Sequence, residues 1–161
     1  QQVLFTRLSK LLHIQASAFA ECVSLQQIIL PQTLHSIGNH AFYRCKELKK
    51  IHFPEGLTSI GREAFYFCKM ETLELPSSVE ILDEGAFFKC MHLTEVCLPT
   101  SIKYLGKHVF RGCNRLKVLE IPHEPEFIGE EIANHSTIIR CQQGSAVDTY
   151  CKENGYNTEY L

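Results

Sequence analysis

One short phrase recurs five times at an almost fixed interval, and this repetition restricts the chain to a single kind of architecture. The phrase consists of a small residue, a phenylalanine and, three residues later, a cysteine, and its cysteines are Cys22, Cys45, Cys68, Cys90 and Cys113. These cysteines are separated by steps of 23, 23, 22 and 23 residues. So regular a period predicts an array in which each copy forms one coil and stacks on its neighbours.

The residues between the repeated phrases also recur in a fixed order, and this order indicates how each coil is built. The coil between Cys45 and Cys68 reads C-x-x-L-x-x-I-x-F-P-x-x-L-x-x-I-G-x-x-A-F-x-x-C. In it the apolar residues Ile51 and Phe53 flank the polar His52, and this alternation predicts a short strand. The proline that follows ends the strand, because proline has no amide hydrogen to donate to a ladder.

A second column of the repeat is glycine in four of its five copies. Its members are Gly38, Gly61, Asp83, Gly106 and Gly129. Glycine, and aspartate to a lesser degree, tolerate a positive φ, so we expect a left-handed backbone turn at this column. The phrase of alanine and phenylalanine that follows suits a short helical turn packed against the interior. The step from Cys68 to Cys90 is one residue shorter than the others, and the missing residue belongs to the turn after Cys68.

The order L-P, L-x-x-I-G, A-F-x-x-C resembles the BspA-like leucine-rich repeat family over roughly residues 11 to 141. This resemblance implies a right-handed leucine-rich repeat solenoid. Short parallel strands would form one sheet face, short turns or helical turns would form the other, and a C-terminal helix and strand would close the array. We accordingly divide the chain into residues 1–10, an N-terminal cap or truncated repeat, residues 11–141, a solenoid of five clear repeats and one degenerate repeat, and residues 142–161, a C-terminal cap.

The C-terminal cap is also predicted from its own residues. Ser145 is a suitable N-cap for a helix from Ala146 to Asn154, and Gly155 is placed to end it. Such a lid would keep the apolar cross-section of the last coil out of water.

The five cysteines of the repeated phrase are predicted to be buried, unpaired side chains. Stacked strands lie about 4.8 Å apart, and side chains in one column point the same way, which is poor geometry for a disulfide. We expect Cys97 to be an outward-facing free thiol, whereas Cys141 and Cys151 flank the cap and could pair. Free thiols favour a reducing cytosol, while the family resemblance implies a cell-surface or secreted protein. Both locations stay open at this point.

Nothing in the sequence points to catalysis. It has no H-E-x-x-H, no G-x-S-x-G and no glycine-rich phosphate loop, and we expect no catalytic residues, no cofactor and no metal site. The acidic pairs Asp83-Glu84 and Glu130-Glu131 are interpreted as solvated turn charge. A net charge of −2 with scattered signs gives no case for nucleic acid. No apolar run is long enough to span a membrane, and whether a signal peptide has been removed stays open.

Function is better sought where the repeats vary on the surface of the predicted strands. Side chains that alternate with the core residues project from the sheet, and stacking turns them into rows across one face. The candidate ligand-facing residues are Gln27, Ile29, Lys50, His52, Thr72, Glu74, Glu95, Cys97, Val118 and Glu120. These rows run from basic to acidic along the array, which would suit a protein or glycan partner.

The resemblance implies an adhesion module that binds an extracellular protein or glycan. The alternative is a structural spacer or an intracellular scaffold that mediates assembly, with weak self-association through the N-terminal end of the array.

Overall fold

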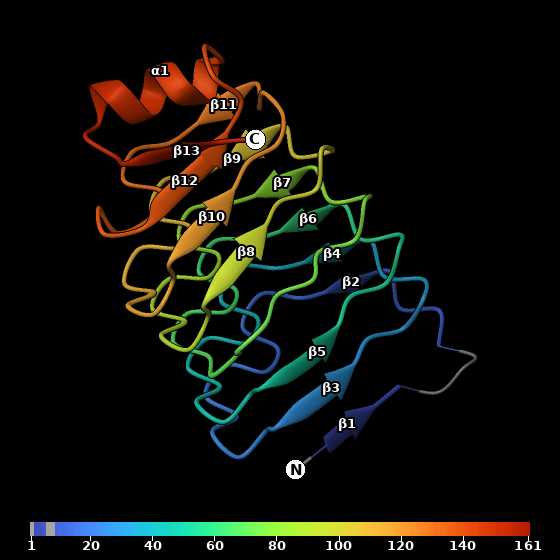
Figure 1. The fold of residues 1–161 in the computed structure, drawn as a ribbon. Coiled ribbons are helices and arrows are strands. Elements are labelled where there is room, and N and C mark those ends of the chain that lie inside the picture. Colours follow the sequence, from blue (N-terminus) through green and yellow to red (C-terminus); the bar gives the residue numbers. More distant parts are fainter. Residues whose placement is uncertain (1, 6–8) are drawn as a thin grey trace.

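A computed structural model describes residues 2–5 and 9–161, so the predicted N-terminal segment lies partly outside the described residues. The chain winds into a solenoid of parallel strands, whose coils stack from the N-terminal end to a helix at the opposite end (Figure 1). Every strand pair is parallel and joins one coil to the next. The predicted solenoid architecture is therefore confirmed.

The strands that follow the cysteine turns form one side of the solenoid, in two separate sheets. The first sheet contains β1 (Gln2–Leu4), β3 (Gln27–Ile29) and β5 (Lys50–His52); the second contains β8 (Glu95–Cys97), β10 (Val118–Glu120), β12 (Ile138–Cys141) and β13 (Thr158–Tyr160). β1 pairs with β3 in parallel, so part of the segment before residue 11 takes the strand position of a coil. We call the outward surface of these two sheets the strand face.

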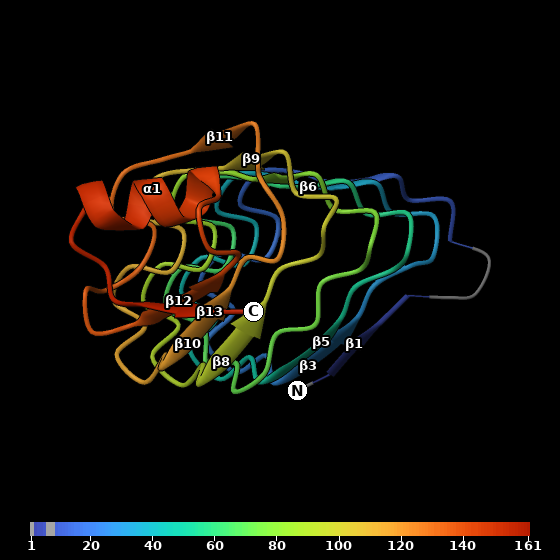
Figure 2. The same cartoon turned by 45° about the horizontal axis from the view of Figure 1, so that its top comes forward.

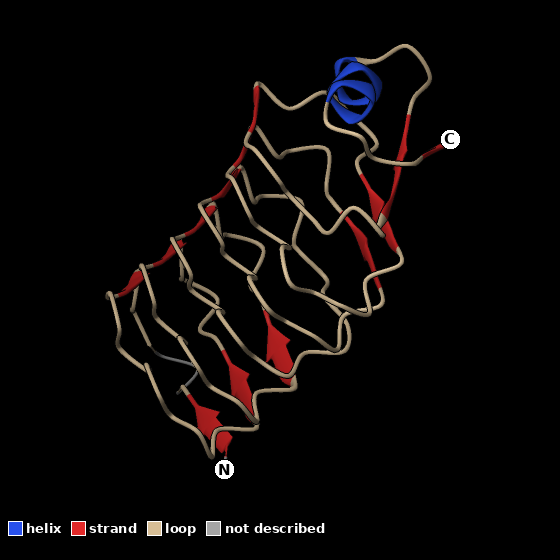
Figure 3. Ribbon diagram, turned by 90° about the vertical axis from the view of Figure 1, so that its left-hand side faces the viewer, coloured by secondary structure: helices blue, strands red, loops and turns tan. Residues whose placement is uncertain are grey.

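The strand face is interrupted where the repeat is one residue short. Residues 72–74, at the position of a strand in the other coils, form no strand. Within the described chain, no backbone amide of residues 70–75 donates to another backbone group. The lost residue removes the turn that follows each of the other buried cysteines of the column, so the next segment does not come into register with β5. The gap between β5 and β8 is visible in Figure 3.

The opposite side, where the sequence predicts only turns, carries an uninterrupted sheet of six two-residue strands. We call it the second sheet, and Figure 2 shows it across the solenoid from the strand face. It contains β2 (His13–Ile14), β4 (Ser36–Ile37), β6 (Ser59–Ile60), β7 (Ile81–Leu82), β9 (Tyr104–Leu105) and β11 (Phe127–Ile128). The second residue of most of these strands is the buried aliphatic residue before the glycine column.

The interior is built from aligned columns, of which the phenylalanine column is the largest. Phe42, Phe65, Phe87 and Phe110 are fully buried, and Phe19 packs on them at the N-terminal end. Successive rings are nearly parallel, with centroids 5.1, 5.1, 5.3 and 5.6 Å apart. These distances give the rise of the solenoid per coil.

The glycine column has a different cause from the one predicted. Gly38, Gly61, Gly106 and Gly129 do not have positive φ; the left-handed residues lie two positions further on, for example His40 and His108. An added Cβ at Gly106 would lie 2.7 Å from the carbonyl carbon of Asp83, in the preceding coil. Glycine is therefore required at these positions by close approach between backbones. The following Ala-Phe segment is a series of tight turns and not a helix.

The buried thiols connect successive coils. The Sγ–H groups of Cys45, Cys68, Cys90 and Cys113 each donate to the carbonyl oxygen of a phenylalanine in the preceding coil, at 3.1 to 3.3 Å. All eight cysteines are free, including Cys141 and Cys151. Cys22, which the sequence predicts to be buried, is exposed, because it lies in the first of the stacked turns.

We expect Cys22 and Cys97 to react with a thiol reagent before the other cysteines of the folded protein, because these two are exposed. The other cysteines are buried, and this burial raises the pKa of Cys45 and Cys113 to about 12, which leaves almost no reactive thiolate. A colorimetric thiol count should therefore rise to all eight cysteines in denaturant. A denatured count well below this number would show that some of the cysteines are paired.

The C-terminal end is closed by the helix α1 (Ala146–Glu153). Its N-cap is Ser145, whose side chain accepts a hydrogen bond from the amide of Asp148, as the sequence predicts. Gly155 follows the helix with a φ of +72°. The buried faces of Val147 and Cys151 cover the end of the core.

Candidate binding surface

The pairing register of the strand face aligns the predicted candidate residues in two rows. Gln27 lies beside Lys50 in one row, and Ile29 lies beside His52 in the other. Beyond the gap, Glu95 aligns with Val118 and Cys97 with Glu120. The side chains between the rows, such as Ile28 and Val96, are buried. The structure thus brings eight of the ten candidates together in paired strands, in two groups.

The remaining two candidates, Thr72 and Glu74, are exposed but lie in the gap. A hollow of about 270 Å³ occurs there, lined by residues 49–53 of β5 and its flanks and by residues 72–74. It contains the side chains of Lys50, His52 and Glu74, so groups of both charge signs border it. The irregular repeat therefore replaces a flat sheet by a concave site with mixed polarity.

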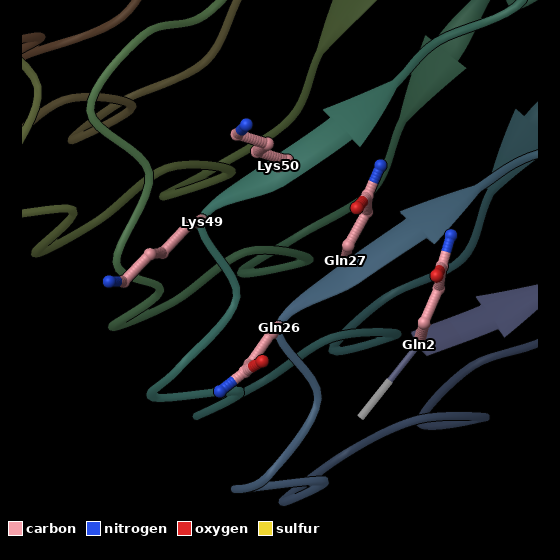
Figure 4. Close-up of a pocket in the computed structure, with 5 residues that line it drawn as sticks. All are labelled: Gln2, Gln26, Gln27, Lys49 and Lys50. Carbon is pink, nitrogen blue, oxygen red and sulfur yellow. The ribbon is translucent and has the colours of Figure 1, made fainter.

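A larger hollow of about 400 Å³ lies over β1, β3 and β5 (Figure 4). Gln2, Gln27 and Lys50 stand in a row on the strand face, whereas Gln26 and Lys49 point away toward the turns. Amide and ammonium groups line this hollow, so it offers several hydrogen-bond donors and acceptors to a polar ligand.

The acidic end of the strand face is partly neutralised by a residue that the sequence analysis missed. Arg140, on β12, forms ion pairs with Glu120 at 3.2 Å and with Glu159 at 2.7 Å. The thiol of Cys97 donates to Glu120 at 3.3 Å. Partial burial and this hydrogen bond raise the pKa of Cys97. Arg140 could have been found by extending the strand position of the repeat into the degenerate coil.

A second missed feature lies on the second sheet. Ile81, Tyr104 and Phe127 are aligned neighbours in it and are 42%, 38% and 47% exposed. The rings of Tyr104 and Phe127 stack with centroids 4.7 Å apart. These three residues could have been found in the sequence, because each is an apolar residue directly before the aliphatic residue that precedes the glycine column.

One glutamate of each acidic pair, Glu84 and Glu131, contacts side chains of neighbouring coils. Glu84 contacts Arg62 at 2.8 Å and Lys107 at 3.5 Å. His40 lies 3.4 Å from Glu63, and an equivalent contact of 3.2 Å joins His108 to Glu131. Over residues 2–5 and 9–161, no group of His, Cys, Asp or Glu side chains is arranged to hold a metal ion. No helix in this part of the chain is long and apolar enough to cross a membrane.

Comparison with known families identifies the repeat. A sequence model described as "BspA type Leucine rich repeat region" matches residues 12–140, in 6 copies. No curated protein matches the chain significantly.

Comparison with solved structures shows the same fold in bacterial proteins. A leucine-rich repeat protein of T. pallidum superposes with a TM-score of 0.77 at 23% identity, covering 98% of this chain and 85% of that one. A leucine-rich repeat protein of Bacteroides ovatus superposes with a TM-score of 0.64 at 20% identity, covering 89% of this chain and 48% of that one. The pneumococcal vaccine antigen PcpA superposes with a TM-score of 0.54 at 20% identity, covering 98% of this chain and 61% of that one. The chain thus spans less than two thirds of the last two proteins.

Proposed function

Because the chain belongs to the BspA-type leucine-rich repeat family, we propose that it is a non-catalytic binding module whose strand face engages an extracellular protein or glycan. Solenoids of this kind present extended, rigid surfaces to their partners. A location at the cell surface or outside the cell is part of the same proposal. It is supported by the likeness to a pneumococcal vaccine antigen and to a leucine-rich cell surface protein of Faecalibacterium prausnitzii.

The observation that carries this proposal is the pair of hollows over β1, β3, β5 and the gap. Together they offer amide, ammonium, imidazole and carboxylate groups on a fixed backbone. The exposed apolar side chain of Ile29, 38% accessible, lies in the row beside His52 and supplies an apolar contact among these polar groups. Such a mixture suits specific recognition, since charges set the orientation of a partner and apolar contacts add affinity.

The proposal is tested by reversing charges on the strand face. We expect a Lys50→Glu, Glu74→Lys, Glu95→Lys variant to fold normally but to lose binding, by roughly tenfold or more, to a partner found in a panel of matrix proteins and surface glycans. The matched control is Glu126→Lys, which changes net charge equally but is exposed beside β11, off the strand face. Equal loss of binding in both variants, or binding by neither the wild type nor the variants, would contradict the proposal.

The alternative function is assembly with other copies. The first coils leave Leu4, Leu11, Leu12 and Val23 exposed, between 37% and 61%. These side chains would be covered by association of two such surfaces. Sedimentation at increasing protein concentration separates the two functions, because a binding module stays monomeric and an assembly unit increases in mass.

A further inference from the structure

Charges that are scattered along the sequence are gathered along one edge of the folded solenoid. The turns that carry the cysteine column stack directly, since Arg44, Phe67 and Lys89 each donate a backbone hydrogen bond to the next coil. Basic side chains are concentrated on these turns and at the strand starts beside them: Arg44, Lys46, Lys49, Lys69, Lys89, Arg111, Arg115 and Lys117. We call this set the basic edge. Acidic residues are fewer there: Glu21, Glu47 and Glu71, together with Glu131, which pairs with Arg111 at 3.4 Å.

The basic edge contains a hollow lined by three lysines. Lys46, Lys69 and Lys89 come from three successive coils and border a space of about 200 Å³, together with Phe67, Met91 and His92. Lys69 forms an ion pair with Glu47, with its Nζ 3.2 Å from the carboxylate. Within residues 2–5 and 9–161, Lys46 and Lys89 have no carboxylate partner. Positive charge at this hollow therefore exceeds negative charge, and an anion would relieve the repulsion among the lysines.

Aromatic side chains flank the lysines. Tyr43, Tyr66 and Phe88 stack in a half-buried column, with centroids 4.7 and 5.6 Å apart. The ammonium of Lys89 lies 5.7 Å from the Tyr66 ring centre and 5.6 Å from that of Phe88, which holds it in place. The ligand would thus meet fixed charges beside phenol hydroxyl groups that can hydrogen-bond to neutral polar groups.

The spacing of the charges selects among polyanions. Lys46 and Lys69 each directly follow a cysteine of the column, so they are separated by the rise of one coil, 5.1 to 5.6 Å on the phenylalanine column, and Lys89 reaches the same hollow from the position before the next cysteine. An extended peptide advances about 3.3 Å per residue, and a strand of duplex DNA carries a phosphate about every 3.4 Å. An extended polymer of six-membered sugars advances by one ring length per unit, which is close to this rise.

We propose that the basic edge binds a linear anionic polysaccharide, with sulfate or carboxylate groups of successive sugars at Lys46, Lys69 and Lys89. The phenol oxygen of Tyr66 lies 3.4 Å from the ammonium of Lys89, so it stands beside this row and can also hydrogen-bond to a sugar hydroxyl. Lys46, Lys69 and Lys89 line neither hollow of the strand face, so this assignment does not depend on the function proposed above.

The test measures binding of the full chain to immobilised dextran sulfate, with unmodified dextran as the neutral reference. We expect the wild type to bind dextran sulfate but not dextran, and Lys46→Gln, Lys69→Gln, Lys89→Gln to weaken binding by roughly tenfold or more. The variant should also flatten the dependence of log affinity on log salt, because fewer counterions are released. The matched control is Lys10→Gln, Lys103→Gln, Lys107→Gln, which removes the same charge from exposed lysines outside the basic edge and the strand face and should change binding less than about twofold.

A charge-retaining variant keeps the test independent of folding defects. Lys46→Arg, Lys69→Arg, Lys89→Arg should keep most of the binding that the glutamine variant loses, since all charges are preserved. The proposal is overturned if dextran sulfate does not bind, or if both glutamine variants lose affinity equally. Tighter binding of oligo-dT or of polyglutamate than of dextran sulfate would overturn the assignment to polysaccharide and indicate a nucleic acid or an acidic peptide.

Discussion

Replacing Phe65 with alanine is expected to lower the free energy of unfolding by about 3 to 5 kcal/mol. The ring of Phe65 is fully buried in the middle of the phenylalanine column. It stacks between Phe42 and Phe87, at 5.1 and 5.3 Å, and meets Phe53 edge-on at 5.7 Å. Its loss would leave a cavity bordered on both sides by neighbouring coils, which are held by their own strands and cannot close over it. Urea denaturation monitored by circular dichroism measures this loss.

The same substitution at Phe19 is the natural comparison. Phe19 stacks on Phe42 alone in the column and is only partly buried, so Phe19→Ala should cost clearly less than Phe65→Ala. Equal losses at the two positions would mean that stability is not transmitted from coil to coil and would contradict the one-dimensional description of the array.

Replacing Gly106 with alanine should destabilise the protein by about 1 to 3 kcal/mol, although it adds a single methyl group. That methyl group would lie 2.7 Å from the amide nitrogen of Glu84 and 3.0 Å from the carbonyl oxygen of Leu82. Both atoms belong to the backbone of the preceding coil, so they cannot move aside as a flexible side chain would. Thermal and urea unfolding of Gly106→Ala against the wild type measures the effect.

Gly56 provides the matched control for this prediction. An added Cβ at Gly56 would meet its nearest atom, the carbonyl oxygen of Leu34, at 3.6 Å, and its φ is not positive. Gly56→Ala should therefore be neutral or stabilise the fold by up to about 1 kcal/mol, through the lower entropy of the unfolded chain. If Gly106→Ala were equally well tolerated, close approach between backbones would not be the reason for the glycine column.

The features that depend on periodicity could be predicted from the sequence. Stacking of coils, the buried phenylalanine column and the capped C-terminal helix all follow from residues that recur or that have strong local preferences, such as Ser145 and Gly155. The outward orientation of Lys50 and His52 followed from alternation alone.

The features that depend on distances between coils could not be predicted from the sequence. Glycine suggests positive φ from local chemistry, whereas at Gly38 and Gly106 the deciding contact is with a residue of the preceding coil. The missing residue after Cys68 can be counted in the sequence, but the resulting loss of a strand at residues 72–74 depends on register with β5. Lys46 and Lys69 directly follow a cysteine of the column, whereas Lys89 directly precedes one, so the convergence of all three on one hollow becomes visible only when the turns are stacked.

The interruption of the strand face gives the molecule two sides with different mechanical properties. The second sheet runs without a break from β2 to β11, so any bend that stretches it must break backbone hydrogen bonds. Across residues 72–74 the opposite side has no ladder, and the nearest backbone hydrogen bond to the preceding coil is the one from the Lys69 amide to the Leu48 carbonyl oxygen, at 3.0 Å. We therefore expect the solenoid to bend more easily on the side of residues 72–74 than on the side of the second sheet. A partner that spans these residues would then select a curvature of the solenoid as well as a set of side chains.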